Sequence, residues 1–205
     1  MQARIDRVAG TVNTWIIGDD EGVIVIDPGE SAEAVLSVVD DREIDFVICT
    51  HGHRRHVAAA FEIAERDGAQ VALHPADRIS WRETHHGTEP DIALEDEGKF
   101  QIADVTLEVI YAPGHTPGSI CLYCEELGAL FTGDVVSSGG PVPHEGFFDD
   151  FPRQLSSIGA AVLTLDGQTR ILAGHGEEFK VADAERRFDS WVSAGPEELI
   201  DKAAE

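Results

Sequence analysis

The chain has 205 residues, of which 42% are hydrophobic, and its 39 Asp and Glu outnumber 15 Lys and Arg to give a formal net charge of −24. This length and apolar content allow one substantial core, so we expect a single domain over residues 1–205 and exclude a disordered chain. The negative charge repels nucleic-acid phosphates and anionic lipid, so we expect no nucleic acid and no membrane among its partners.

The first predicted elements are a strand hairpin, a helix and a buried strand. Residues 14–20 and 22–29 are short β-branched runs bounded by Gly, Asp and Pro, which is typical of paired strands. Ser31 stands in an N-cap position before a helix over residues 32–41. Residues 45–50 then form an apolar run that predicts a strand leading directly to a histidine.

The middle of the chain predicts one further helix and several strands. Residues 57–66 have helical spacing, and Gly68 is a plausible stop. Residues 75–91 are polar and are expected to be irregular. Alternating or continuous apolar runs predict strands over residues 70–75, 106–114, 119–124 and 128–134.

The last part repeats this plan of strands and helices. Residues 151–165 and 181–194 have helical character, and residues 170–176 form a strand that ends in glycines. Strands followed by helices, occurring twice, predict two stacked sheets with helices outside.

Three imidazoles lie within six positions after the strand at residues 45–50, in the run HGHRRH, as His51, His53 and His56. Imidazole is the commonest metal ligand in proteins, and two histidines two positions apart can converge on one ion where a chain turns after a strand. A glycine between them relieves the turn. The run therefore predicts a metal site in the loop that follows the strand.

Three further strand ends deliver a histidine or a carboxylate into a glycine-bearing loop. His115 lies in APGHTPGS, Asp134 in FTGD and His175 in AGHG. Each residue taken alone is ordinary, but together with HGHRRH they concentrate metal ligands at one edge of a sheet.

In this order, the four motifs resemble those of the metallo-β-lactamase-fold superfamily, and the early IDPG resembles its loop beneath the metals. The glyoxalase II (hydroxyacylglutathione hydrolase) branch is the most similar, because GHTPGS and FTGD are followed by a GG loop and DFPRQLSSI. The resemblance implies an α+β, four-layered αββα sandwich. It also implies first-site ligands His51, His53 and His115, a bridging Asp134, and second-site ligands His56 and His175.

Arg55 departs from the family pattern HxHxDH, which has an aspartate at this position. A guanidinium neither ligates a metal nor deprotonates, and its charge opposes a second dication a few Å away. We therefore expect one tight Zn²⁺ site, with Asp134 as the catalytic carboxylate that orients water. Arg55 is expected to bind a substrate anion or stabilise the oxyanion, and an ion pair with an acid is its structural alternative. His144 is a candidate substrate-binding residue, and His144 or Glu145 a candidate replacement ligand.

The favoured function is a metal-dependent hydrolase of a small thioester or ester, with metal-bound water as nucleophile. Two alternatives stay open: a mononuclear iron oxidoreductase similar to persulfide dioxygenases, and a non-catalytic binding protein on a degenerate hydrolase scaffold. The expected partner is a small-molecule substrate.

The expected compartment is the cytoplasm. No apolar run approaches the roughly 20 residues that span a bilayer, and the N-terminus lacks the apolar core of a signal peptide. Cys49, Cys121 and Cys124 are expected to be free thiols. The few lysines among many carboxylates favour a halophilic protein over an acidic mesophilic one.

Overall fold

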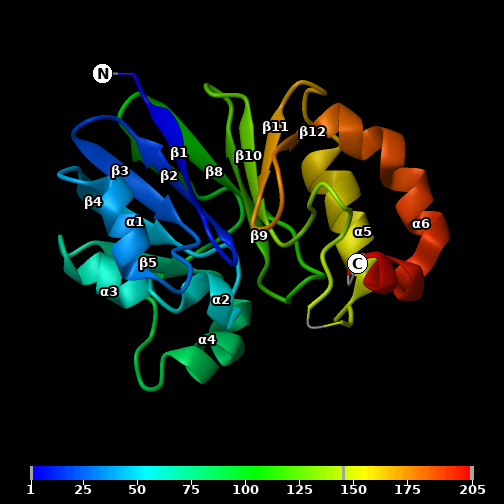
Figure 1. Ribbon diagram of the computed structural model, residues 1–205, viewed down its shortest axis with the longest axis horizontal. Coiled ribbons are helices and arrows are strands. Elements are labelled where there is room, and N and C mark those ends of the chain that lie inside the picture. Colours follow the sequence, from blue (N-terminus) through cyan, green and yellow to red (C-terminus); the bar gives the residue numbers. More distant parts are fainter. Residues whose placement is uncertain (1, 145, 204–205) are drawn as a thin grey trace.

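Two six-stranded sheets form the centre of the computed structural model, which describes residues 2–144 and 146–203 (Figure 1). The first sheet follows chain order: β1 (Arg4–Ala9), β2 (Asn13–Gly18), β3 (Gly22–Ile26), β4 (Glu43–Ile48), β5 (Gln70–Leu73) and β6 (Ile92–Ala93). The second sheet contains, from edge to edge, β12 (Phe179–Lys180), β11 (Arg170–Ala173), β10 (Ala129–Gly133), β9 (Ile120–Cys124), β8 (Val105–Tyr111) and β7 (Lys99–Ile102).

Helices cover the outer face of each sheet. The first sheet packs against α1 (Ala32–Val39) and α3 (Ala60–Glu65), and the second packs against α5 (Phe151–Ser157), the π-helical turn η2 (Ile158–Val162) and α6 (Val181–Ala203). Figure 1 shows these layers side by side, with α2 (Arg54–Val57) and α4 (Arg78–Thr84) at one end of the first sheet. The predicted αββα sandwich is confirmed.

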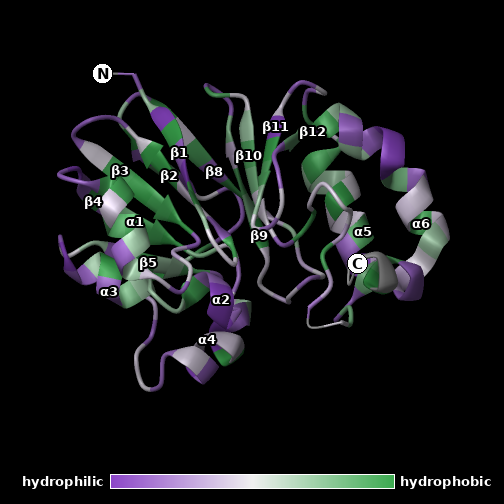
Figure 2. Ribbon diagram, viewed as in Figure 1, coloured by the Kyte–Doolittle hydropathy of each residue, from purple (hydrophilic) through white to green (hydrophobic). Residues whose placement is uncertain are grey.

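Strand alternation explains why both faces of the first sheet are apolar. In β3, Ile24 and Ile26 face the second sheet, and Val23 and Val25 face α1. Successive side chains of a strand point to opposite faces, so a strand that is covered on both sides is continuously apolar. Figure 2 shows the resulting green strands between helices whose solvent sides are purple.

Several local predictions are confirmed. β2 and β3 form the antiparallel hairpin, and the Ser31 side chain accepts a hydrogen bond from the Ala34 backbone N–H at the start of α1. The three cysteines are free and buried. Cys121 and Cys124 lie on opposite faces of β9, as a three-residue spacing on a strand requires.

Two local predictions are wrong. Residues 75–91 are not irregular throughout, because the helical turn η1 (Pro75–Asp77) leads into α4, which buries Trp81 against α3. The sequence signal for this helical turn was a proline at its first position, preceded by His74 as the N-cap. The helix expected over residues 57–66 is interrupted, since α2 ends at Val57 and α3 begins at Ala60.

Parallel pairing brings the ends of several strands to one edge. β3 pairs with β4, β4 with β5, and β10 with β11, in each case in parallel. The carboxyl ends of parallel strands share an edge, so the loops after these strands meet there. No helix of the described ranges is long and apolar enough to cross a bilayer.

Candidate metal centre

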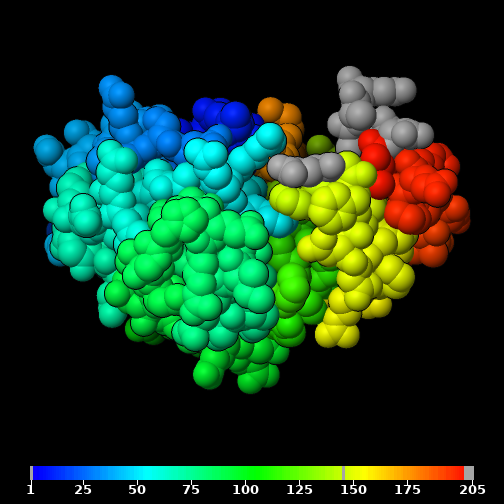
Figure 3. All heavy atoms as spheres, turned by 90° about the horizontal axis from the view of Figure 1, so that it is seen from below, coloured from blue at the N-terminus to red at the C-terminus, as the bar shows by residue number. Residues whose placement is uncertain are grey.

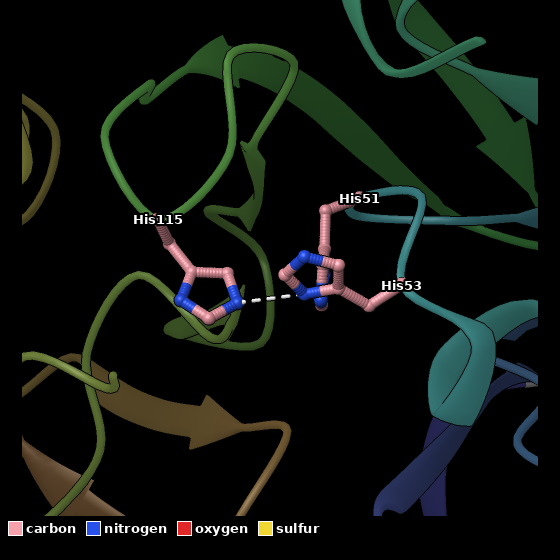
Figure 4. A group of neighbouring side chains, drawn as sticks. All are labelled: His51, His53 and His115. Atoms are coloured by element: carbon pink, nitrogen blue, oxygen red, sulfur yellow. Dashed lines mark hydrogen bonds between the residues drawn. The ribbon is translucent and has the colours of Figure 1, made fainter. Parts of the chain in front are cut away.

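Three imidazoles converge at this edge from two loops. His51 and His53 lie between β4 and α2, and His115 lies in the loop between β8 and β9; Figure 4 shows their rings pointing toward one another. His53 Nδ1 lies 3.1 Å from His115 Nε2, and one nitrogen from each residue lies within 4.8 Å of the others. Ligand atoms of a tetrahedral zinc ion are about 3.3 Å apart, so this spacing suits one ion.

Asp134 connects this group to a second one. Its Oδ2 atom lies 3.3 Å from His56 Nε2 and 3.2 Å from His175 Nε2. The same atom lies 3.6 Å from His115 Nε2 and 3.9 Å from His51 Nε2. One carboxylate oxygen therefore lies among four imidazoles, and the six side chains predicted from the sequence as metal-binding are brought together.

Hydrogen bonds determine which nitrogen of His51 faces the cluster. Asp27 accepts a hydrogen bond from the Thr50 hydroxyl at 2.8 Å, and the His51 Nδ1 atom lies 3.1 Å from the same hydroxyl oxygen. Since the only hydroxyl proton goes to the carboxylate, His51 Nδ1–H is the donor to Thr50. The lone pair of His51 is therefore on Nε2, which faces Asp134.

His56 and His115 are oriented in the same way. His56 Nδ1 lies 3.0 Å from Asp27 Oδ2, and His115 Nδ1 lies 2.9 Å from the Val142 carbonyl oxygen. Both partners only accept hydrogen bonds, so each Nδ1 is the donor and each Nε2 is turned toward the cluster.

The cluster contains buried polar atoms that a cation would satisfy. His51 Nε2, His56 Nε2 and Asp134 Oδ1 are buried and have no hydrogen-bond partner among the described residues. Leaving such atoms unpaired costs about 1–3 kcal/mol each. Imidazole lone pairs with a carboxylate form a donor set that suits zinc or iron, so the residues present fit a metal ion.

Close backbone approach is required at two glycines of the site. A Cβ atom at Gly174, just before His175, would lie 2.5 Å from Asp134 Oδ1 and 2.6 Å from His56 Cε1. A Cβ atom at Gly52 would lie 2.8 Å from the carbonyl oxygen of Asp77. Neither contact is possible for a real Cβ, so both glycines are needed for the cluster to close.

The surroundings lower the pKa of three imidazoles in the cluster and raise the pKa of a fourth. Burial, reinforced by the neighbouring His115 and His144, lowers the pKa of His53 to about 3. Burial also lowers the pKa of His51 and of His115. At His56 burial acts in the same direction, but Asp134 and Asp27 outweigh it and raise the pKa to about 10.

The pKa of Asp134 is held well below its usual value. Burial of the carboxylate acts to raise it, and the adjacent His56 and His175 outweigh burial. Asp134 therefore stays ionised, which is the state that binds a cation.

Sequence reasoning missed two aspartates that hold the cluster in place. Asp27 Oδ1 accepts from the Thr50 backbone N–H at 2.8 Å, so both of its oxygens are occupied and it orients His56 rather than facing the cluster. The IDPG motif pointed to this loop without assigning the residue. Asp77 accepts from Gly52 N, Thr116 Oγ1 and Gly118 N at 2.6–2.7 Å. It thus connects the two histidine-bearing loops, and no motif in the sequence marked it.

Arg55 lies at the start of α2, between His53 and His56. Its side chain is exposed and makes no hydrogen bond or ion pair with any residue that the structure describes, and the same holds for Arg54. The alternative of an ion pair between Arg55 and Asp134 is therefore not found. Two exposed arginines without a partner among the described residues thus follow His53 in a chain of net charge −24.

His144 contacts the site through the face of its ring. It stacks on His53 with 3.6 Å between ring centroids and 18° between ring planes. No group of converging ligand atoms within residues 2–144 and 146–203 includes it. Glu145, the other candidate replacement ligand, lies outside the described residues.

Comparison with known proteins gives one family and several close folds. A family model described as "Metallo-beta-lactamase superfamily" matches residues 7–175. The hydroxyacylglutathione hydrolase GloC of Haemophilus influenzae is 28% identical over 190 residues, which cover 85% of this chain and 90% of that protein.

Two solved structures have similar folds. The BLEG-1 B3 metallo-beta-lactamase superposes with a TM-score of 0.79 at 25% identity, covering 90% of this chain and 97% of that one. TTHA1623, solved in a di-iron-bound form, superposes with a TM-score of 0.76 at 24% identity, covering 87% of this chain and 96% of that one.

Proposed function

The chain belongs to the metallo-beta-lactamase superfamily, and on that basis we propose that it hydrolyses a small thioester or ester at the cluster around Asp134. One observation carries the proposal: a buried carboxylate lies among four imidazoles, of which His51, His56 and His115 are hydrogen-bonded so that Nε2 faces inward.

We assign the tighter metal position to His51, His53 and His115. Two of these ligands come from one loop, and Asp77 fixes that loop against the loop that carries His115. Asp134, His56 and His175 form the second group, and Arg55 opposes a second ion there by its charge. The proposed centre therefore holds one tight zinc ion, with iron as the alternative metal.

A metal ion held by these residues would act as a Lewis acid: it would polarise a carbonyl oxygen and lower the pKa of water to about 7. Asp134 orients the attacking water, since its Oδ1 atom is buried and has no partner among the described residues. Arg55, which is exposed and has no partner among the described residues, binds an anionic group of the substrate or the developing oxyanion. His144 packs on His53 at the rim and contacts the substrate.

The thioester assignment is supported by the similarity to the Haemophilus influenzae hydroxyacylglutathione hydrolase and by the GHTPGS and FTGD motifs. The substrate proposed for this chain is a small molecule and not a nucleic acid, because 39 carboxylates repel a polyanion. Three buried free cysteines are consistent with a reducing compartment, for which we propose the cytoplasm.

An iron-dependent oxidation is the second candidate. It is motivated by the single metal site that is proposed because Arg55 opposes a second ion, and by the presence of iron in the similar fold TTHA1623. A non-catalytic binding protein is less favoured, because the converging imidazoles and Asp134 form a complete donor set.

Metal analysis combined with two assays tests the proposal. Protein purified without added metal should contain close to one equivalent of zinc, and it should hydrolyse a panel of short thioesters in a way that a chelator abolishes and zinc restores. Bound iron together with oxygen consumption on a persulfide would establish the oxidation instead. Absence of bound metal and of both activities would support the binding protein.

A further inference from the structure

A cavity of about 610 Å³ opens beside the metal centre, and His175 belongs to both. His175 Nε2 lies 3.2 Å from Asp134 Oδ2, so a molecule in the cavity reaches the cluster through this residue. The volume lies within the range of about 300–1,000 Å³ that is usual for small-molecule sites.

One wall of the cavity is the loop that follows β10. Pro141, Val142 and Pro143 contribute apolar surface. Hydrogen bonds fix the position of this loop, because the Val142 carbonyl oxygen accepts from His115 Nδ1 and from Gln154 Nε2. The cavity wall and the metal-facing imidazole of His115 are thus held by the same carbonyl.

The opposite wall comes from the last turns of α6. Gly195 has a φ of 74°, and Pro196 follows it, so the helix changes direction there. The segment after this kink contributes Leu199 and Ile200 to the cavity. Figure 3, seen from below, shows the yellow segment after β10 lying between the α2 and α4 side and the red end of α6.

The described part of the lining carries no charged side chain. No aspartate, glutamate, lysine or arginine side chain is among the described residues around the cavity, and Ser137 and His175 are its polar ones. Transfer of an ionised group into such a lining is costly, whereas a hydrocarbon chain gains about 0.8 kcal/mol for each buried CH₂ group. The cavity therefore selects an apolar group.

The two sides of the cluster differ in chemistry. Arg54 and Arg55, which have no partner among the described residues, are on α2, at one end of the first sheet (Figure 1). The cavity is lined by the loop after β10 and by the end of α6, the helix that covers the second sheet. The arginines and the apolar lining thus belong to different elements, so an anionic part and an apolar part of a substrate have separate places to bind.

We propose that this cavity binds the hydrocarbon acyl chain of the substrate, so that the enzyme prefers medium-chain acyl thioesters or esters whose leaving group is anionic. This inference rests on the proposed hydrolase function. The scissile carbonyl then lies at His175 and Asp134, and the leaving group lies toward Arg55.

Two series of thioesters test the orientation. The first keeps a carboxylate-bearing thiol and lengthens a straight acyl chain from two to eight carbons; kcat/KM should rise about fourfold per methylene until the cavity is filled. The second keeps an acetyl group and lengthens an alkyl thiol; kcat/KM should stay nearly flat. A flat first series with active short substrates would overturn the inference and leave the hydrolase intact. A rise in the second series alone would overturn the acyl assignment.

Binding without turnover separates the two proposals. Straight-chain alcohols from butanol to octanol, titrated calorimetrically into chelator-treated protein, should bind about fourfold more tightly per methylene. If the alcohols bind in this way but the protein hydrolyses no ester or thioester, the proposed hydrolase function is wrong and the cavity is still a site for apolar chains. Binding that is independent of chain length would show that the cavity does not bind a hydrocarbon chain.

Variants of the two walls make the test specific. Ile200→Ser and Val142→Ser should each lower the gain per methylene, and each changes a different wall. Val192→Ser is the matched control, since Val192 is on α6, 51% exposed, and not part of the lining. Thermal melts select the variants that fold. An unchanged chain-length dependence in both folded wall variants would refute the assignment.

Discussion

His56 is bound between two carboxylates, with Nδ1 against Asp27 and Nε2 against Asp134. The three imidazoles at the tighter position have the opposite surroundings, because burial and neighbouring imidazoles disfavour their charged forms. At neutral pH the metal-free cluster therefore contains one protonated imidazole, that of His56, and three neutral ones. The consequence appears in the pH dependence of the metal-free protein.

Stability of the chelator-treated protein should rise with pH up to about 6.5 and fall above it. The folded pKa of His53 is about 3 against an ordinary 6.5, so below 6.5 the unfolded chain takes up protons that the folded chain refuses, and acid favours unfolding. The folded pKa of His56 is about 10, so its stabilising contribution is complete below 6.5 and is lost as pH rises toward 10.

Urea unfolding in the presence of a chelator at about pH 5, 6.5 and 9 measures this profile. His53→Gln should reduce the slope of the acid limb, to which His51 and His115 also contribute, and His56→Gln should flatten the alkaline limb. A free energy of unfolding that changes in one direction across the whole range would contradict the assignment of these protons.

Replacing His53 or His115 by Ala should remove bound zinc and hydrolysis together, because each supplies one of three ligands at the tighter position. Zinc content by mass spectrometry and thioester hydrolysis are the two measurements. A full equivalent of zinc retained by either variant would show that the ligands lie elsewhere.

Arg55→Asp should create a second tight metal site. The added carboxylate joins His56, His175 and Asp134 as a fourth ligand, and an opposing positive charge is removed. Arg54→Asp makes the same charge change at the neighbouring exposed position and is the matched control. Calorimetric zinc titration should give one tight equivalent for wild type and Arg54→Asp and two for Arg55→Asp; two tight equivalents in the wild type would contradict the idea.

At the scale of elements, two loops from different sheets must be fixed against each other for the cluster to form. Asp77, at the end of η1, accepts three hydrogen bonds that join the loop of His51 and His53 to the loop of His115. Burial raises the pKa of this carboxylate, opposed by its donors. Its role is to position ligands rather than to contact substrate.

Asp77→Asn should weaken zinc binding by about tenfold to a hundredfold, the usual effect of losing a group that orients ligands. Asp166→Asn is the matched control, since Asp166 accepts a hydrogen bond from the Gln168 N–H in an exposed turn. Competition titrations with a chelator of known affinity give the dissociation constants. Equal affinities in the two variants would show that the loops are held without Asp77.

The elements that could be predicted from the sequence are those with strong local signals. The hairpin and the helix after Ser31 follow from apolar runs with turn and capping residues at their ends. α4 was missed because Trp81 is its one buried residue and packs against α3, a contact that appears only in three dimensions. Asp77 was missed for the same reason, since its three partners are 25 to 41 residues away.

At the scale of the whole molecule, self-repulsion dominates the electrostatics. Exposed ion pairs such as Arg82 with Glu89 contribute little to stability and weaken further in salt. The net charge of −24 opposes the compact state everywhere on the surface, and the Debye length falls from about 30 Å at 0.01 M to about 3 Å at 1 M salt.

The melting temperature should therefore rise by several degrees from low ionic strength to about 1 M potassium chloride, where about 2–4 °C corresponds to 1 kcal/mol at this chain length. Calorimetric scans at several salt concentrations provide the test, with sucrose as an uncharged control. A flat or falling melting temperature would remove the halophilic interpretation and leave the hydrolase proposal untouched.

The kink at Gly195 and Pro196 separates two tasks along the chain. Every proposed metal ligand lies at or before His175, whereas Leu199 and Ile200 follow the kink. One wall of the proposed acyl cavity thus comes from a stretch of sequence that carries no proposed ligand, whereas the other wall comes from the loop after β10. If the proposed function holds, exchanging the segment after Pro196 between homologous chains would change the first wall and leave every proposed ligand in place.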